Sequence, residues 1–166
     1  MRSAYIAAIV GILWMLPGAQ AHEYRQGDLV ITHPWARPTS GDTHLGAAYL
    51  TIKNMGEAAD TLQSVSSSVA AKTEIHEHIH DSDGVMRMRR IEGGLPIPPG
   101  GTVEVKPGGY HLMLVGLQRN LEEGKSVPLK LSFARAGEIE VEVNVEKSPT
   151  HSASEGMGGA EAHMHH

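Results

Sequence analysis

Short blocks in which apolar and polar residues alternate run along most of the chain, and they predict β-strands. The clearest block is EIEVEVNVE at 138–146, where alternation gives a strand one wet face and one face toward a core. No segment shows the periodicity of a helix of three turns. Nine blocks are expected to form strands: 29–32, 47–53, 62–65, 73–79, 85–89, 102–105, 111–115, 127–133 and 139–145.

Turn-forming residues separate these blocks at regular intervals. Examples are Asp83-Gly84, the PPGG stretch at 98–101 and the PGG stretch at 107–109. Many short strands joined by such turns are typical of a β-sandwich or barrel. With 166 residues and 40% hydrophobic content, the chain has room for one such domain and short appendages.

The two ends differ from this pattern. Residues 1–21 combine Arg2, an apolar run at 5–16, a Pro-Gly break and an A-x-A ending, which predicts a cleaved secretory signal and a mature start at His22. The alternative, a membrane anchor, is disfavoured because the run is shorter than the ~20 residues that a spanning helix needs. Residues 147–166 are rich in Ser, Gly, Ala, His and Met and predict a flexible tail, which leaves 22–146 as the domain.

Composition narrows the functional classes. Fourteen Lys and Arg against nineteen Asp and Glu give a formal net charge of −5, which provides no basic surface for nucleic acid. The chain has no cysteine, so no disulfide supports the fold. In an oxidising compartment thiolate metal sites compete with disulfide formation, whereas methionine remains usable as a ligand.

Histidine and methionine supply the candidate chemistry. Imidazole nitrogen with thioether sulfur favours copper, and Cu(I) above all, over zinc, calcium or magnesium. Alternation places His111 and Met113 on one face of a strand. It also places the three histidines at 76, 78 and 80 on one face before the 81–84 turn, and the two methionines at 86 and 88 on one face after it. Taken alone, a methionine in a strand is usually core filler, and a histidine is usually an exposed or hydrogen-bonded side chain rather than a ligand. Their clustering favours ligation, with His76, Met88, His111 and Met113 as the principal set and His78, His80 and Met86 as secondary candidates.

These residues and their flanking blocks resemble the PCuAC family of periplasmic copper chaperones. That family's pattern is a histidine, about ten residues, a methionine, about twenty-one residues, and then H-x-M. The resemblance covers nearly the whole mature domain, through HPWARPT at 33–39, GAAYLTIKNMG at 46–56, EIHEH at 74–78, GVMRMR at 84–89, EGGLPIPPGG at 92–101 and KPGGYHLMLVGL at 106–117.

The resemblance implies a cupredoxin-like Greek-key β-sandwich that binds Cu(I) through His76, Met88, His111 and Met113. It also implies delivery of copper to the copper-centre subunit of cytochrome c oxidase or to a Sco-type assembly protein. We accordingly expect a periplasmic monomer that is not an enzyme and has no stable membrane insertion after signal cleavage. The two intervals here are eleven and twenty-two residues, each about one longer than the family pattern, so Met86 remains an alternative to Met88.

Three alternatives stay open. The tail is either a second site, for Cu(II), or a solvated segment with incidental affinity; its candidate ligands are His151, Met157, His163, Met164, His165 and His166. A copper-buffering or resistance protein would use the same main site without a dedicated acceptor. A copper enzyme of the histidine-brace type would use the amine and imidazole of His22, but the 4% aromatic content disfavours a substrate-binding surface.

Overall fold

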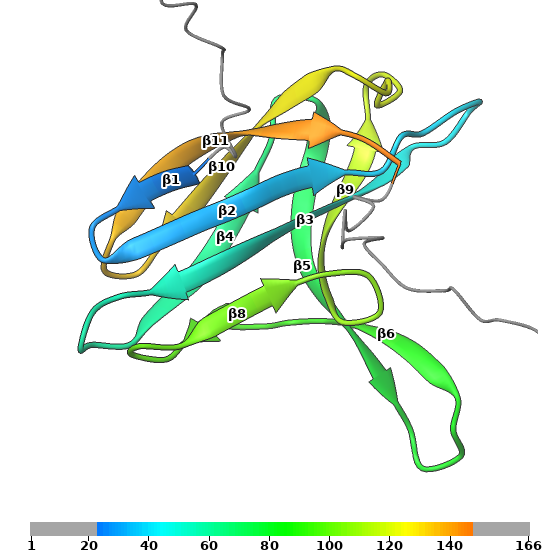
Figure 1. Cartoon of the computed structure of the whole chain (residues 1–166). Helices are drawn as coiled ribbons and strands as arrows, with labels where there is room; N and C mark the ends of the chain where they lie inside the picture. The colour runs from blue at the N-terminus through cyan, green and yellow to red at the C-terminus, as the bar shows by residue number, and fades with distance from the viewer. Residues whose placement is uncertain (1–22, 148–166) are drawn as a thin grey trace, which may run out of the picture.

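The protein is an all-β domain in a computed structural model that describes residues 23–147 (Figure 1). Within these residues there are eleven strands and no helix, so none that could span a membrane. The strands are β1 (Glu23–Gln26), β2 (Leu29–Ala36), β3 (Leu45–Asn54), β4 (Asp60–Ser66), β5 (Ala70–His80), β6 (Met86–Arg90), β7 (Leu95–Ile97), β8 (Thr102–Val105), β9 (Tyr110–Leu117), β10 (Ser126–Phe133) and β11 (Gly137–Val145). The predicted signal at 1–21 and the tail beyond residue 147 lie outside the described residues.

All eleven strands belong to one hydrogen-bonded sheet. Its order is β6-β5-β9-β8-β3-β2-β11-β10-β4-β7, with β1 added on β2 and a further pairing of β3 with β9. The pairings are antiparallel except for β2 with β11 and β8 with β9, which are parallel. The sheet curves over so that β4 also packs against β5, which is far from it in the strand order. The predicted all-β, cupredoxin-like class is confirmed.

The core lies on the concave side of this curved sheet and is almost entirely aliphatic. Ile75, Leu112 and Leu114 come from β5 and β9 and are buried in it. Strand β11 shows the expected alternation, because its glutamates are exposed while Val141, Val143 and Val145 are buried. This burial, rather than any disulfide, holds the domain together.

Each of the nine predicted blocks is a strand, but the sequence pattern missed β1 and β7. Strand β1 contains a single apolar residue among its four, and β7 has only three residues, Leu95-Pro96-Ile97. Pro96 has no backbone N–H to donate to a neighbouring strand. It is tolerated because β7 forms one end of the strand order and has a neighbour on one side only. Trp35 is buried, and its ring packs on Tyr49 with centroids 4.6 Å apart.

Candidate metal centre

The opposite end of the strand order carries the predicted ligands. Strand β5 lies between β6 and β9, and the β5–β6 hairpin extends away from the rest of the domain (Figure 1). In the antiparallel register His76 is opposite His111, and His78 is opposite Met88. Met113 is opposite Glu74. Residues directly opposite each other point to the same face, so this end of the sheet presents one face of imidazoles, thioethers and a carboxylate.

The register places His76 at the centre of the principal set. Opposite residues have Cβ atoms about 5 Å apart and diagonal ones about 7–8 Å apart. His111 is directly opposite His76, while Met113 on β9 and Met88 on β6 are both diagonal to it. Met86 is opposite His80, four residues farther along β5, or roughly 13 Å from His76 at the rise of a strand. The structure therefore brings Met88, and not Met86, to the neighbourhood of the histidine pair.

Three imidazole rings meet on this face. The centroids of His76 and His111 are 5.6 Å apart with the rings edge to face, and those of His78 and His111 are 4.8 Å apart with the rings stacked. The Nδ1 atoms of His76 and His78 and the Nε2 atom of His111 are buried without any hydrogen-bond partner. Buried polar atoms in proteins almost always have partners, so three unpartnered nitrogens in one cluster make this face a candidate ligand site.

Two turns fix the strands that carry these side chains. Between β5 and β6 the Asp81 carboxylate accepts hydrogen bonds from the N–H groups of Asp83 and Val85, and Gly84 adopts a positive φ of 75°. Before β9 the Gly109 N–H donates to the carbonyl of Lys106 at 3.0 Å, and the Gly109 carbonyl accepts from the His78 N–H at 3.2 Å. The first turn sets the register of Met88, and the second sets the position of His111.

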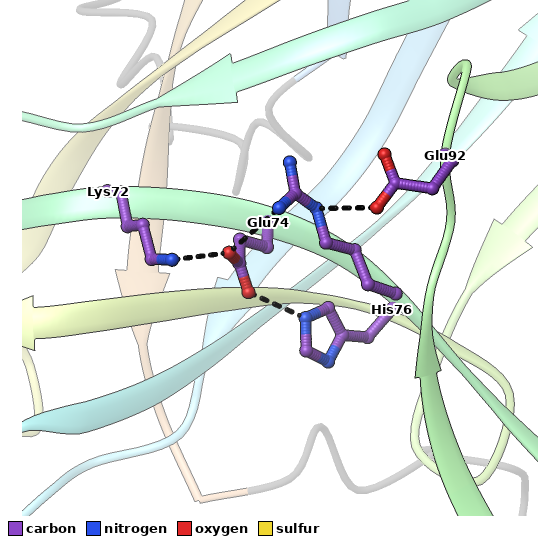
Figure 2. Close-up of polar contacts among 5 residues, drawn as sticks. Lys72, Glu74, His76 and Glu92 are labelled. Carbon is purple, nitrogen blue, oxygen red and sulfur yellow. Dashed lines mark hydrogen bonds and ion pairs between the residues drawn. The ribbon is translucent and has the colours of Figure 1, made fainter.

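A charged cluster borders the imidazoles (Figure 2). The Glu74 carboxylate lies 2.6 Å from the Lys72 Nζ, 2.9 Å from the His76 Nε2 and 3.5 Å from the Arg90 Nη1. Hydrogen bonds from Lys72 and His76, followed by the charges of Lys72 and Arg90, outweigh partial desolvation and lower the pKa of Glu74 to about 2. The carboxylate is consequently ionised at neutral pH.

Burial varies sharply across the face. His111 is only 3% exposed, and the His76 side chain is 15% exposed, whereas Met88 is 49% exposed. Desolvation lowers the pKa of His111; its contact with the Gly109 carbonyl opposes this, and the neighbouring His78 and His76 lower it further. His111 is therefore a neutral imidazole at pH 7, the form that donates a lone pair to a metal.

The donor set fits a soft monovalent metal better than a hard one. Within residues 23–147, no three imidazole or carboxylate side chains are arranged so that they alone hold a metal ion. A metal on this face would thus need the thioethers of Met88 or Met113 together with the histidines. Imidazole and thioether without thiolate is the combination that suits Cu(I).

The secondary candidates are distributed unevenly. His78 belongs to the imidazole cluster, through its contact with His111. His80 and Met86 are opposite each other at the exposed part of the hairpin. His22 and the tail candidates, His151, Met157, His163, Met164, His165 and His166, lie outside the described residues.

Glu74 borders the imidazole cluster, although the sequence pattern did not single it out. The signal was present, because Glu74 is two residues before His76 in a strand and so shares its face. What the sequence could not show is that Glu74 bonds the ring of His76, since a carboxylate in an alternating strand is more simply a solvated side chain.

Together these features define an all-β, cupredoxin-like domain with a histidine and methionine cluster at one end of its sheet. A family model described as "LpqE-like: Putative lipoprotein LpqE-like" matches residues 29–145. The chain belongs to this LpqE-like family, which is of the PCuAC type, so the expected resemblance is confirmed.

Individual relatives agree with this assignment. "Putative lipoprotein Lxx21020" of Leifsonia xyli is 29% identical over 150 residues, covering 87% of this chain and 89% of the relative. Among solved structures, the "Copper-bound PCuAC domain from PmoF2" has a TM-score of 0.64 at 28% identity, covering 75% of this chain and 97% of its own. The "Apo PCuAC domain from PmoF1" has the same TM-score at 26% identity, covering 75% and 98%.

Proposed function

We propose that this protein is an exported copper chaperone that binds Cu(I) through His76, Met88, His111 and Met113. The observation that carries the proposal is the pair of directly opposed histidines whose buried ring nitrogens, Nδ1 of His76 and Nε2 of His111, lack partners. The two methionines diagonal to His76 supply sulfur on either side. A related PCuAC domain of known structure is copper-bound, which supports the choice of metal.

The chemistry of the site suits transfer as well as binding. Neutral imidazoles and thioethers leave the bound ion its own single charge, and they hold Cu(I) less firmly than thiolates do. A cysteine-containing acceptor would therefore draw the ion away. Met88, half exposed beside the buried histidines, is the ligand that an incoming acceptor group would reach and replace first.

The acceptor that we propose is the copper-centre subunit of cytochrome c oxidase, or a Sco-type protein on the way to it. A transfer assay tests this: the Cu(I)-loaded protein is mixed with each apo acceptor domain, and the copper content of both is measured after separation. We expect copper to move to at least one acceptor. Retention of copper by the donor against both acceptors would instead favour the buffering or resistance role.

The proposed place of action is the periplasm, after removal of residues 1–21. Relatives described as lipoproteins support export. We propose a binding role rather than catalysis, with the tail at 147–166 as a second site, for Cu(II). An enzyme of the histidine-brace type would show turnover with oxygen and a reductant and would lose that turnover when His22 is replaced.

The thioethers give the most direct test of the Cu(I) site. Replacing Met88 and Met113 together with alanine is expected to weaken Cu(I) binding by at least about a hundredfold, or about 2.7 kcal/mol, in competition against a chromophoric Cu(I) chelator. The matched control replaces Met55 and Met86, two methionines that are both more than half exposed, and should bind like the unaltered protein. Equal affinities for the two double variants would refute the proposed site.

A further inference from the structure

Glu74 occupies a position that the metal-binding role does not by itself require. It lies on β5 two residues before His76, on the same face, and its side chain is only 13% exposed. Its two carboxylate oxygens face different partners: Oε1 lies near Lys72 and Arg90, and Oε2 lies 2.9 Å from the His76 Nε2. Figure 2 shows the carboxylate between the lysine and the imidazole.

The contact between Glu74 and His76 dictates which ring nitrogen is free. An ionised carboxylate has only acceptor sites, so the His76 Nε2 must carry the proton and donate it. In the neutral ring the lone pair is then on Nδ1. That atom is buried and has no hydrogen-bond partner. Geometry and tautomer thus agree on Nδ1 as the nitrogen available to a metal.

His111 shows the complementary arrangement. Its Nδ1 lies 3.4 Å from the carbonyl of Gly109, which can only accept, so Nδ1 is the protonated nitrogen in this contact. Its Nε2 is buried and unpartnered. The two opposed rings therefore offer different nitrogens, each fixed by an acceptor on its other side.

We infer that Glu74 is a positioning residue for copper: it holds the His76 ring so that Nδ1, and not Nε2, coordinates the ion, while His111 coordinates through Nε2. This inference rests on the proposed Cu(I) site and specifies its ligand atoms. A carboxylate that receives the far N–H of a ligating histidine fixes the ring orientation and makes the ring a stronger donor. Lys72 and Arg90 pair with the other carboxylate oxygen, Oε1, and leave Oε2 to the imidazole.

A simpler role must be separated from this one, because Glu74 also joins Lys72 and Arg90 across two strands. If the ion pairs alone mattered, removing Lys72 would have the same effect as removing Glu74. Lys72→Met leaves the bond between Glu74 and His76 in place and so isolates the ion pair. Glu77→Ala is a second control, because Glu77 is a carboxylate on the same strand that pairs with Arg89 instead.

The experiment measures Cu(I) affinity by chelator competition for the full chain and for Glu74→Ala, Glu74→Gln, Lys72→Met and Glu77→Ala. Removing a carboxylate that orients a ligand is expected to weaken binding by about 10- to 100-fold in Glu74→Ala. Glu74→Gln should lose less, because the amide oxygen still accepts from Nε2–H. The Cu(I) affinities of the two control variants, Lys72→Met and Glu77→Ala, should stay within about threefold of the unaltered protein, well short of the loss expected for Glu74→Ala.

A spectroscopic readout identifies the ligand atoms directly. In nitrogen-15 NMR of the chain loaded with silver(I), an analogue of Cu(I), coupling to silver should appear on the His76 Nδ1 and on the His111 Nε2. Coupling to the His76 Nε2 would overturn the inference. So would a Glu74→Ala variant with unchanged affinity, or a Lys72→Met variant as weak as Glu74→Ala.

A failure of the role inferred for Glu74 can be distinguished from a failure of the proposed Cu(I) site. If the Met88 and Met113 double variant loses Cu(I) affinity while Glu74→Ala keeps it, the copper site stands and only the role of Glu74 is refuted. If the double variant keeps its affinity, the proposed site itself is wrong.

Discussion

Asn54, Asp60 and His111 are the most deeply buried polar residues of the described chain, and of these three only His111 keeps a buried polar atom without a hydrogen-bond partner. Asn54 donates to the Ala58 carbonyl and accepts from the Gly56 N–H, and Asp60 accepts from the backbone. His111 keeps its Nε2 buried without a partner. Leaving a polar group unsatisfied costs about 1–3 kcal/mol, so the fold bears a cost at His111 that it does not bear at Asn54 or Asp60, as expected of a proposed metal ligand.

Asp60 provides a test of the structural kind. Desolvation raises its pKa, but hydrogen bonds from the N–H groups of Arg135, Thr61 and Ala136 outweigh it, and the pKa is lowered overall. Asp60→Ala leaves these donors without their acceptor and should lower the free energy of unfolding by about 3 kcal/mol at pH 7. Urea denaturation measures this, with the exposed Asp42→Ala as the matched control.

The same residue predicts a pH dependence. Because the folded pKa of Asp60 is below its unfolded value, its ionised form stabilises the fold above the unfolded pKa of roughly 4, and this contribution is lost as the pH falls through the folded value. The difference in unfolding free energy between the unaltered protein and Asp60→Ala should therefore shrink below about pH 4. If the difference in unfolding free energy stayed constant down to pH 2.5, ~1.5 units below the unfolded pKa, the ionised Asp60 carboxylate would not be what stabilises the fold.

At the scale of elements, the β5–β6 hairpin determines whether methionine reaches the histidines. The sequence predicted both strands and their turn, because alternation and the Asp83-Gly84 signal are local properties. It could not choose between Met86 and Met88, which share a face, because that choice depends on the register across the hairpin. It also could not show which strand pairs with the other edge of β5, since the pairing with β9 joins residues far apart in the chain.

The turn of this hairpin should therefore affect copper binding. The Asp81 side chain accepts hydrogen bonds from the Val85 N–H and from Arg87 Nε at 2.9 and 2.7 Å. Asp81→Ala should speed amide hydrogen exchange along β6 and weaken Cu(I) binding about threefold, because Met88 would be held less firmly. Global stability should change little, since every residue of β6 is exposed.

Asp83→Ala is the matched control, because Asp83 lies in the same exposed turn. Only the backbone N–H of Asp83 bonds to Asp81, and alanine keeps that N–H. This variant should exchange and bind like the unaltered protein. If Asp81→Ala and Asp83→Ala behave alike, the turn does not position Met88.

At the scale of the molecule, the hydrophobic core of the described residues contains none of the four candidate ligands. The core is continuous and aliphatic, and the candidate ligands lie at one end of the sheet, away from most of it. The domain should therefore be folded without copper and gain stability on binding by mass action. At a free Cu(I) concentration a hundred times the Kd, the gain is about 2.7 kcal/mol.

Thermal unfolding under anaerobic conditions checks this expectation. The unaltered protein should unfold cooperatively without copper, and its Tm should rise as free Cu(I) increases. The double replacement of Met88 and Met113 should leave the copper-free Tm nearly unchanged and abolish most of the rise. A protein that is unfolded without copper would show that the metal is part of the core, contrary to this account.

The proposed site holds one Cu(I) ion through two imidazoles and two thioethers. X-ray absorption at the copper edge reports the ligand atoms of the full chain with one equivalent of Cu(I). The candidate tail ligands are replaced by alanine in this sample: His151, Met157, His163, Met164, His165 and His166. We expect two nitrogen and two sulfur scatterers around copper, with the sulfur signal lost when Met88 and Met113 become alanine. Copper surrounded by nitrogen and oxygen alone would contradict the proposed site.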